Sequence, residues 1–370
     1  MLSMSSVASV CAAAFGLLVG SFLNVCIYRL PRGISVNNPR RSFCPRCERL
    51  IPWFENVPVF SWLLLRGRCA GCQRPISARY VLVELIAAVL FAAITLKWGT
   101  SNWAMQAAYA VLVSLLIVAT FVDLEHLIIP DEVTWGGVAA GLLLAPLVPA
   151  MHGSASPLAS FVEAALGAVA GYGLLWAVAE GGRLVFGRRK FQFEPPVALL
   201  WVRRGDEAQM EVDGETLQWG ELFVRGSEKV TMQVVSGVVD GKAIIPGLAI
   251  WQFERLKIGD LEMDLNAVET GEFQISELTL PREVMGYGDV KFLAAIGAFL
   301  GWKSVLFTVM AASVGGAAFG ILSFLLGKRE WAAKIPFGPY LALGALLWLL
   351  RGPELVVAYW QWTQGLNARI

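Results

Sequence analysis

Charged residues are scarce in this chain of 370 residues: they make up 16% of it, whereas hydrophobic residues make up 56%. A soluble globular protein carries about 25% charged residues, so this deficit argues against a soluble fold and for one embedded in a bilayer. Only two histidines are present, too few for a metal site built on several His ligands. The formal net charge of +1 gives no electrostatic reason to expect nucleic acid as a partner.

Long hydrophobic runs are what the chain has in abundance. A helix needs about 20 apolar residues to cross the hydrocarbon core. The first run lacks a basic segment before it, so it is predicted to be an uncleaved helix rather than a signal peptide. The predicted fold is therefore an all-α polytopic membrane protein with about eight transmembrane helices. These lie at residues 7–28, 80–97, 103–122, 133–150, 161–186, 290–300 (a short run), 304–326 and 337–350.

Arginine predicts the orientation of these helices. Residues 29–79 contain ten Arg and only two acidic residues. Loops rich in Lys and Arg stay in the cytoplasm, so this segment is predicted to be cytoplasmic. Alternation of the eight helices then places residues 188–190, which are Arg, Arg and Lys, on the same side. Both ends of the chain are predicted to lie outside.

Two polar segments interrupt the helices, and both are predicted to be cytoplasmic. The second contains apolar residues near alternate positions at 229–235 and the turn pairs Asp213-Gly214 and Asp240-Gly241, a pattern typical of short strands and hairpins. It is predicted to be a small β-rich insertion. The predicted organisation is a first helix at 1–28, a cysteine loop at 29–79, helices two to five at 80–187, the insertion at 188–280, helices six to eight at 281–352 and a tail at 353–370.

Two acidic residues lie at matching depth. Asp123 follows the third run, and Asp289 precedes the sixth within Gly286-Tyr287-Gly288-Asp289. Carboxylates beside hydrocarbon are costly and tend to mark function. Two close carboxyl groups share a proton, so that one can activate water while the other polarises a peptide carbonyl, as in aspartic proteases. The glycines would give the backbone unusual freedom before the acid. The alternative is that Asp289 only caps a helix.

Four cysteines form two C-x2-C pairs in the first polar segment. They are Cys44 with Cys47 and Cys69 with Cys72, with 21 residues between the pairs. Four thiolates at such spacing suit tetrahedral Zn²⁺, so a structural zinc site is predicted. A disulfide or redox pair is the alternative, which a reducing cytoplasm disfavours.

Three further acids are expected to serve structure rather than chemistry. Glu84 and Glu163 lie within predicted helices, where a hydrogen bond in the bundle is favoured over catalysis. Asp131 follows Pro130 and precedes Thr134 by three positions, so it is predicted to cap the fourth membrane helix.

These blocks together resemble the prepilin leader peptidases among the Gly-x-Gly-Asp aspartyl proteases. Besides residues 286–289 and Asp123, the run Gly-Ser-Phe-Leu-Asn-Val-Cys-Ile-Tyr-Arg-Leu-Pro at residues 20–31 is similar to that family's first-helix signature. Residues 56–58, 61–63 and 66–69 match later blocks. The resemblance implies cleavage of type IV prepilins or pseudopilins at the cytoplasmic face of the bacterial inner membrane. It implies Asp123 and Asp289 as the catalytic pair, with Gly286 and Gly288 in the active-site loop.

The resemblance also implies a second activity. Many bacterial members N-methylate the new amino terminus with S-adenosylmethionine, but no glycine-rich strand-turn-helix in this chain points to a site for that cofactor, and no residue is assigned to it. The insertion at residues 188–280 departs from the family's short connection. It either selects substrates or docks pilus or secretion assembly components, or it is a tolerated loop expansion.

Two functions of other classes are weighed against the protease. One is an ion- or proton-coupled transporter, which would place its acids near the bilayer midplane and often in repeated positions. The other is a non-catalytic, zinc-bearing assembly scaffold, in which the cysteines would matter and the two aspartates would not. The key acids lie near one face and no repeat is found, so the protease is favoured.

Overall fold

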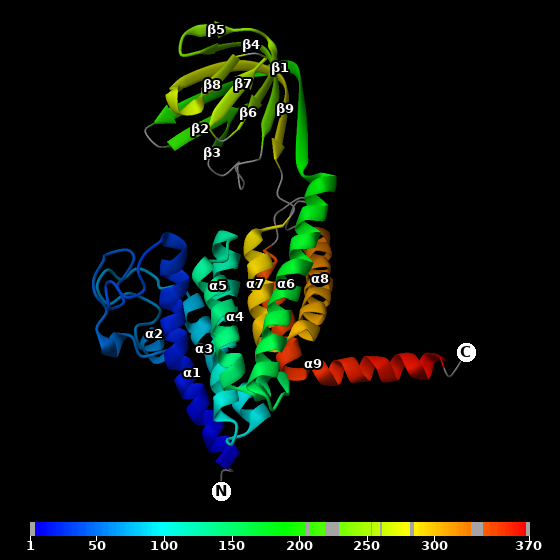
Figure 1. The fold of residues 1–370 in the computed structure, drawn as a ribbon. Coiled ribbons are helices and arrows are strands. Elements are labelled where there is room, and N and C mark those ends of the chain that lie inside the picture. Colours follow the sequence, from blue (N-terminus) through cyan, green and yellow to red (C-terminus); the bar gives the residue numbers. More distant parts are fainter. Residues whose placement is uncertain are drawn as a thin grey trace. The chain divides into compact units, whose positions relative to one another are not determined.

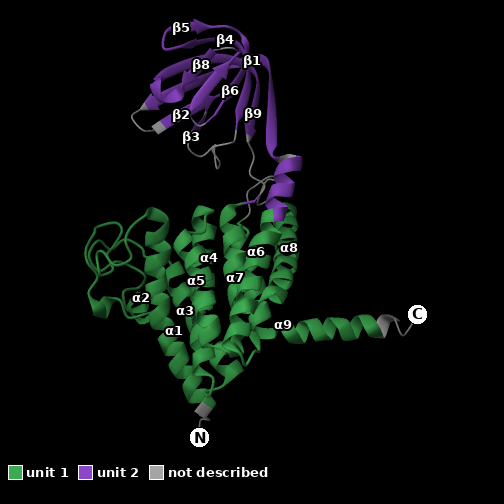
Figure 2. Ribbon diagram, viewed as in Figure 1, with its two compact units in different colours: residues 1–176, 286–370 green, residues 177–285 purple. Residues whose placement is uncertain are grey.

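The computed structural model describes residues 4–204, 207–218, 229–252, 254–259, 261–281, 285–326 and 336–367 (Figure 1). The chain forms two compact units (Figure 2). One, called the helical unit below, comprises Met1–Trp176 and Gly286–Ile370, and the other, called the β unit, comprises Ala177–Met285.

The helical unit is a bundle in which successive long helices run in alternating directions (Figure 1). A short helix, α2, lies in the cysteine loop, and the end of α6 belongs to the β unit. The helices are α1 Met4–Arg29, α2 Phe60–Leu64, α3 Arg79–Trp98, α4 Trp103–His126, α5 Asp131–Leu147, α6 Pro157–Phe186, α7 Tyr287–Leu300, α8 Trp302–Leu325 and α9 Gly338–Asn367.

Six of the described helices are long and apolar enough to cross a membrane: α1, α3, α4, α6, α8 and α9. This agrees with a multi-pass membrane protein. The other two long runs also form helices, but α5 has 17 residues and α7 has 14, short of the roughly 20 that a crossing needs. The predicted number of eight crossings is therefore not confirmed.

The bundle turns much of its apolar surface outward. Of the most apolar 18-residue stretch of each helix, only 17% is buried in α8 and only 28% in α1. Water would penalise such exposed hydrophobic surface, whereas lipid does not. Most of the apolar side chains of these helices are therefore placed to contact lipid.

Helices α6 and α7 pack closely because small residues face each other. A Cβ added at Gly167 would overlap the carbonyl oxygen of Gly297, and one added at Gly297 would overlap that of Gly167. One turn away, a Cβ at Gly171 would overlap the carbonyl of Leu293. Small residues spaced by four let helix backbones approach in membranes. This contact positions α7, which carries Asp289.

Helix α9 continues well past the predicted end of the last membrane run. The segment predicted as a tail from residue 353 is helical as far as Asn367, with Pro353 inside the helix. Beyond the proline the helix projects sideways from the bundle (Figure 1). Its Tyr359, Trp360 and Trp362 are all exposed, and such aromatic residues favour the membrane–water interface.

The β unit contains one antiparallel sheet, so the predicted β-rich insertion is confirmed. Within the described residues the order is β3-β2-β1-β9-β4-β6-β7-β8, with β5 paired to β4. The strands are β1 Arg188–Arg204, β2 Glu207–Val212, β3 Glu215–Gln218, β4 Val230–Val239, β5 Lys242–Ile244, β6 Gly247–Trp251, β7 Arg255–Ile258, β8 Leu261–Asp264 and β9 Thr270–Pro281.

Both predicted turn pairs join adjacent strands of this sheet. Asp213-Gly214 connects β2 to β3, and Asp240-Gly241 connects β4 to β5; all four residues have positive φ, as a type I′ hairpin turn requires. Alternate residues of the strands form one core around Trp201.

We predict that Gly167→Ala destabilises the bundle by about 1–3 kcal/mol, the usual cost of overpacking a close contact. Gly173→Ala is the matched control, because a Cβ on this glycine of the same helix meets nothing within 4 Å. Thermal unfolding in detergent should show a lower midpoint for the first variant only. Equal midpoints for the two variants would contradict the proposed packing.

Candidate active site and cysteine cluster

Asp123 lies in the last turn of α4 and is 5% exposed. Its Oδ2 accepts a hydrogen bond from the backbone N–H of Gly338 at 2.9 Å. Gly338 is the first residue of α9, so the carboxylate also lies at the positive end of a helix dipole. A hydrogen bond with a charged acceptor is stronger than one between neutral groups, and this one fixes the side chain.

Asp289 lies in the first turn of α7, after Gly286 at the N-cap. Its Oδ1 is buried and has no hydrogen-bond partner among the described residues. This oxygen is therefore not engaged in capping the helix. A buried carboxyl oxygen without a partner is costly and is available to a water molecule or a substrate.

The structure brings the two acids together. Helix α4 ends, and α7 and α9 begin, at one end of the bundle (Figure 1), called the acid-bearing end below. Asp289 lies within electrostatic range of Asp123. Ile129, in the loop after α4, lies against both Gly288 and Gly338, so three segments converge around the pair.

The glycines of the motif matter because they have no side chain, and not because they adopt an unusual backbone conformation. Gly286 has φ −66° and ψ 135°, an extended conformation open to most residues, so the predicted special conformation is wrong for it. A Cβ on Gly288 would lie 3.2 Å from the Cβ of Ile129, and one on Gly338 would lie 2.8 Å from Oδ2 of Asp123. A side chain at Gly338 would crowd Asp123, and one at Gly288 would crowd Ile129.

Asp131 does not cap α5 with its side chain. The N-cap is Pro130, and Asp131 is the first helical residue. Its carboxylate instead pairs with the Lys291 ammonium at 2.6 Å. The capping prediction is wrong because a cation from α7, distant in sequence, competes for the carboxylate. The ion pair ties the start of α5 to the start of α7, two residues after Asp289.

The four predicted cysteines form one cluster. Their sulfur atoms all lie within 4.8 Å of one another, and Cys44 Sγ is 3.9 Å from Cys72 Sγ. Tetrahedral zinc with Zn–S bonds of about 2.3 Å would separate its sulfurs by about 3.8 Å. All four are free thiols, so the structure contains no support for the alternative of a disulfide here. The donor set fits a metal ion such as zinc.

Each cysteine pair sits on the same backbone turn. Cys44 N–H donates to Arg49 O at 3.0 Å, and Cys69 N–H donates to Arg74 O at 3.0 Å. The residue after each pair, Glu48 or Gln73, has positive φ. The sequence signal for this repeat is Arg two positions after each second cysteine, and it is too short to detect as a repeat from sequence alone.

The backbone of the second turn favours a thiolate. N–H groups of Cys72 and Gly71 donate to the sulfur of Cys69 and lower the pKa of that thiol to about 7. A thiolate, not a thiol, is the metal ligand. The second turn therefore favours the form of Cys69 that binds a metal ion.

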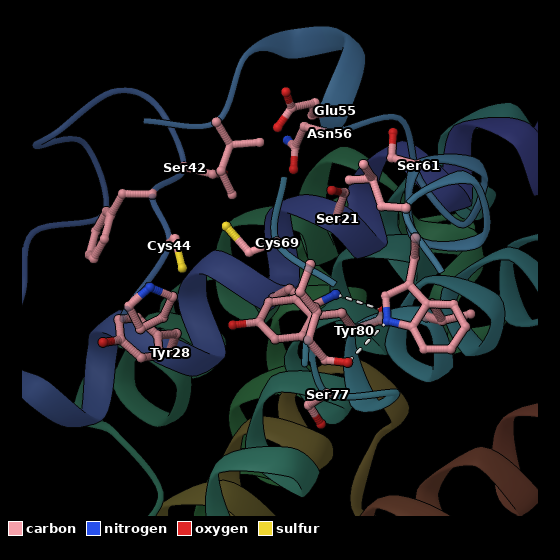
Figure 3. Close-up of a pocket in the computed structure, with 18 of the residues that line it drawn as sticks. Ser21, Tyr28, Ser42, Cys44, Glu55, Asn56, Ser61, Cys69, Ser77 and Tyr80 are labelled. Carbon is pink, nitrogen blue, oxygen red and sulfur yellow. Dashed lines mark hydrogen bonds between the residues drawn. The ribbon is translucent and has the colours of Figure 1, made fainter. Parts of the chain in front are cut away.

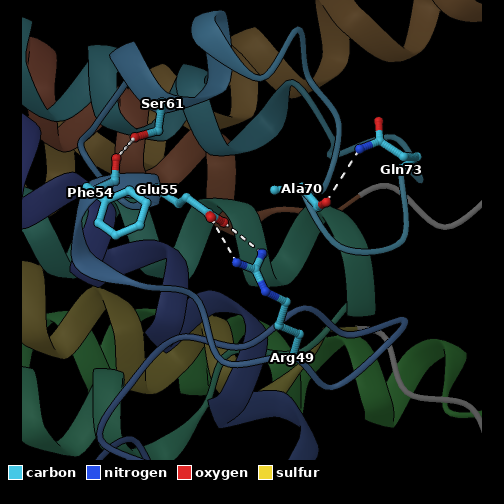
Figure 4. A network of polar contacts seen from close by, with 6 residues as sticks. All are labelled: Arg49, Phe54, Glu55, Ser61, Ala70 and Gln73. Carbon is cyan, nitrogen blue, oxygen red and sulfur yellow. Dashed lines mark hydrogen bonds and ion pairs between the residues drawn. The ribbon is translucent and has the colours of Figure 1, made fainter.

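Polar contacts hold the rest of the cysteine loop. Arg49 makes a forked ion pair with Glu55, with N–O distances of 2.9 and 2.8 Å (Figure 4). Arg29 is 2% exposed and donates to four carbonyls of the loop, including those of Pro39 and Arg41. Because these carbonyls have no partner in secondary structure, Arg29 organises the chain that leaves α1.

Glu84 and Glu163 differ in their surroundings. Glu84 is 7% exposed, and its Oε2 accepts the N–H of Val59 at 2.8 Å, so the predicted structural hydrogen bond is confirmed. Glu163 instead lies within electrostatic range of His152. Glu84 also lines a cavity of about 280 Å³ between α1, the cysteine loop and α3 (Figure 3).

Known proteins match this chain over most of its length. Residues 14–98 match the bacterial peptidase A24 N-terminal domain, and residues 110–193 and 257–321 match the type IV leader peptidase family. The chain is similar to a prepilin leader peptidase/N-methyltransferase of Aeromonas hydrophila, with 30% identity over 93% of this chain and 91% of the relative. Another protein of that name, from Myxococcus xanthus, is 34% identical over 92% and 89%. No solved structure matches significantly.

Proposed function

Because the chain belongs to the type IV leader peptidase family, we propose that it is an aspartyl endopeptidase that cuts leader peptides from type IV prepilins or pseudopilins. The observation that carries this proposal is the convergence of Asp123 and Asp289 at the acid-bearing end. Neither a transporter nor a non-catalytic scaffold is supported by the matched family and relatives.

The proposed mechanism divides the work between the two acids. Close carboxyl groups share one proton, and the N–H of Gly338 stabilises negative charge on Asp123. Asp123 would then take a proton from the attacking water. Asp289, whose Oδ1 has no protein donor among the described residues, would be neutral and donate to the carbonyl oxygen of the scissile peptide. Gly286 and Gly288 would leave room for an extended substrate.

We predict that Asp123→Asn or Asp289→Asn lowers the rate of prepilin cleavage by at least about a thousandfold, as expected when an acid–base group is lost. The matched control is Glu132→Gln, which neutralises an exposed acid near the start of α5. Cleavage should be followed by the mass of the product, with purified protein in detergent. Wild-type rates in either Asn variant would refute the assignment.

The proposed topology is eight crossings of the bacterial inner membrane, with α5 and α7 as the short ones. The ten Arg of residues 29–79 favour a cytoplasmic position for the cysteine loop. The acid-bearing end would then face the cytoplasm, where the basic leader of a prepilin is accessible.

The proposed ligand of the cysteine cluster is Zn²⁺, held by Cys44, Cys47, Cys69 and Cys72. We predict one zinc per chain by elemental analysis and loss of that zinc in Cys69→Ser, because three thiolates hold the ion far less tightly than four. Cys11→Ser is the matched control, since Cys11 lies in α1 outside the cluster. Zinc retained at the wild-type level in Cys69→Ser would exclude this site.

The proposed role of the β unit is to select substrates or to dock a pilus or secretion component. The family match stops at residue 193 and resumes at 257, so most of the sheet is extra to the family's fold. Its surface exposes apolar side chains, among them Ile245 and Leu248.

We predict that replacing residues 188–280 with a short Gly/Ser linker abolishes cleavage of at least one natural substrate while keeping cleavage of a short peptide that spans the cut site. Arg188 and Pro281 are paired neighbours on β1 and β9, so a short linker can rejoin the chain. The measurement is cleavage of a mixture of all natural prepilins, in which each product is identified by its mass. Undiminished cleavage of every one would leave the β unit a tolerated expansion.

The proposed second activity is N-methylation of the new amino terminus, with S-adenosylmethionine as donor. It is supported by the relatives, which are named prepilin leader peptidase/N-methyltransferase. In this reaction the lone pair of the amino nitrogen forms a bond to the methyl carbon, the carbon–sulfur bond breaks with its electrons left on sulfur, and the nitrogen loses a proton to water.

A further inference from the structure

The cavity beside the cysteine cluster is not used by the peptidase mechanism. Its volume of about 280 Å³ is close to the lower limit of small-molecule sites, roughly 300 Å³. Its walls come from α1, the cysteine loop and α3, and both Cys44 and Cys69 reach it (Figure 3). Three features of its walls indicate the chemistry of a ligand.

The first feature is the amide oxygen of Asn24, which has no hydrogen-bond partner among the described residues. Asn24 is 3% exposed, and its Nδ2 donates to the carbonyls of Gly20 and Tyr80 at 3.3 and 2.9 Å. These two bonds fix the amide, yet its Oδ1 is buried without a partner among the described residues. Buried acceptors are almost always satisfied, so an N–H or O–H group of a ligand is expected here.

The second feature is a buried acid without a cation. Glu84 is held by the Val59 N–H and by the Ser21 hydroxyl, but no basic side chain pairs with it within the described part of the chain. Buried carboxylates are normally paired with a positive charge. A cationic ligand would supply that charge.

The third feature is the aromatic lining. Tyr28, Trp62 and Tyr80 line the cavity, and two of these rings are drawn beside it in Figure 3. Aromatic faces attract cations and stack on flat heterocycles. Four arginines also line the cavity: Arg29, Arg46, Arg49 and Arg74. Together with Glu84, Asn24 and the rings, they suit a molecule that has a cationic centre, a carboxylate, hydrogen-bond donors and an aromatic base.

The cavity is also a neighbour of the acid pair. Tyr80 follows Arg79, whose guanidinium nitrogen lies 2.9 Å from both carboxylate oxygens of Glu125. Glu125 is two residues after Asp123 on the last turn of α4. This ion pair therefore joins the start of α3, which lines the cavity, to the end of α4, which carries Asp123.

We propose that this cavity binds S-adenosylmethionine, with Glu84 facing its positive charge and Asn24 Oδ1 accepting one of its donors. The inference rests on the proposed methylation and assigns it a site. The residues fit this donor: the carboxylate matches its cationic groups, the amide oxygen its hydroxyl and amino groups, and the rings its adenine. The cavity's place beside Asp123 matches the order of the two reactions.

The test is equilibrium dialysis of radiolabelled S-adenosylmethionine against the full-length protein in detergent. Glu84→Gln keeps the shape and an oxygen acceptor for the Val59 N–H but removes the charge, and it should weaken binding at least about tenfold. Glu163→Gln is the matched control, an acid on α6 that does not line the cavity, and its affinity should stay within about twofold. Equal affinity of wild type and Glu84→Gln would overturn the proposal.

Two further measurements separate this proposal from the peptidase assignment. Glu84→Gln should still cleave prepilin, which shows that it is folded, and Asp123→Asn should still bind S-adenosylmethionine.

A photoreactive azido-adenosyl analogue should label wild-type peptides containing residues 21–29 or 76–84. Labelling confined to other helices or to the β unit would refute the cavity, whatever the cleavage assay shows.

Discussion

The hydrogen bond from Gly338 N–H to Asp123 is the contact on which the acid-bearing end depends. It joins the end of α4 to the start of α9 and presents a buried carboxylate to the positive end of a helix dipole. Because the donor is a backbone group, its position is set by the helix itself and does not cost side-chain entropy. The absence of a Cβ at Gly338 is what allows the approach, since one would lie 2.8 Å from the carboxylate oxygen.

The bilayer explains why this arrangement is built from helix ends. Irregular backbone within hydrocarbon is tolerated only where protein or a water-filled cavity satisfies its polar groups. Here α4 ends, and α7 and α9 begin, around the two acids. The last carbonyls of α4 and the first N–H groups of α7 and α9 are the backbone groups left without helical partners. The close α6–α7 packing through Gly167 and Gly297 holds α7 at the depth that brings Asp289 to Asp123.

Site residues that belong to short sequence motifs could be predicted. Residues that meet only in the folded chain were missed. The position of the two aspartates at one end of the bundle and the clustering of the four cysteines were predictable from short motifs and their spacing. Gly338 was missed because its role is one backbone N–H aimed at a residue 215 positions away. Lys291 was missed for the same reason, and the capping role predicted for Asp131 failed because that distant cation takes its carboxylate. The number of crossings could not be fixed, since the runs that form α5 and α7 are too short for hydropathy to decide.

The proposed roles of the cavity and the acid pair agree with the order of the two proposed reactions. Cleavage creates the very amine that methylation consumes, so a separate enzyme would have to recapture a substrate whose new terminus lies at the membrane surface. The ion pair between Arg79 and Glu125 fixes the start of α3 to the end of α4, and these are the elements that carry the cavity wall and Asp123. A rigid link between two sites raises the effective concentration of the amine at the second site without any new binding contact. In the proposed scheme, this salt bridge is one of the contacts that connect the two sites.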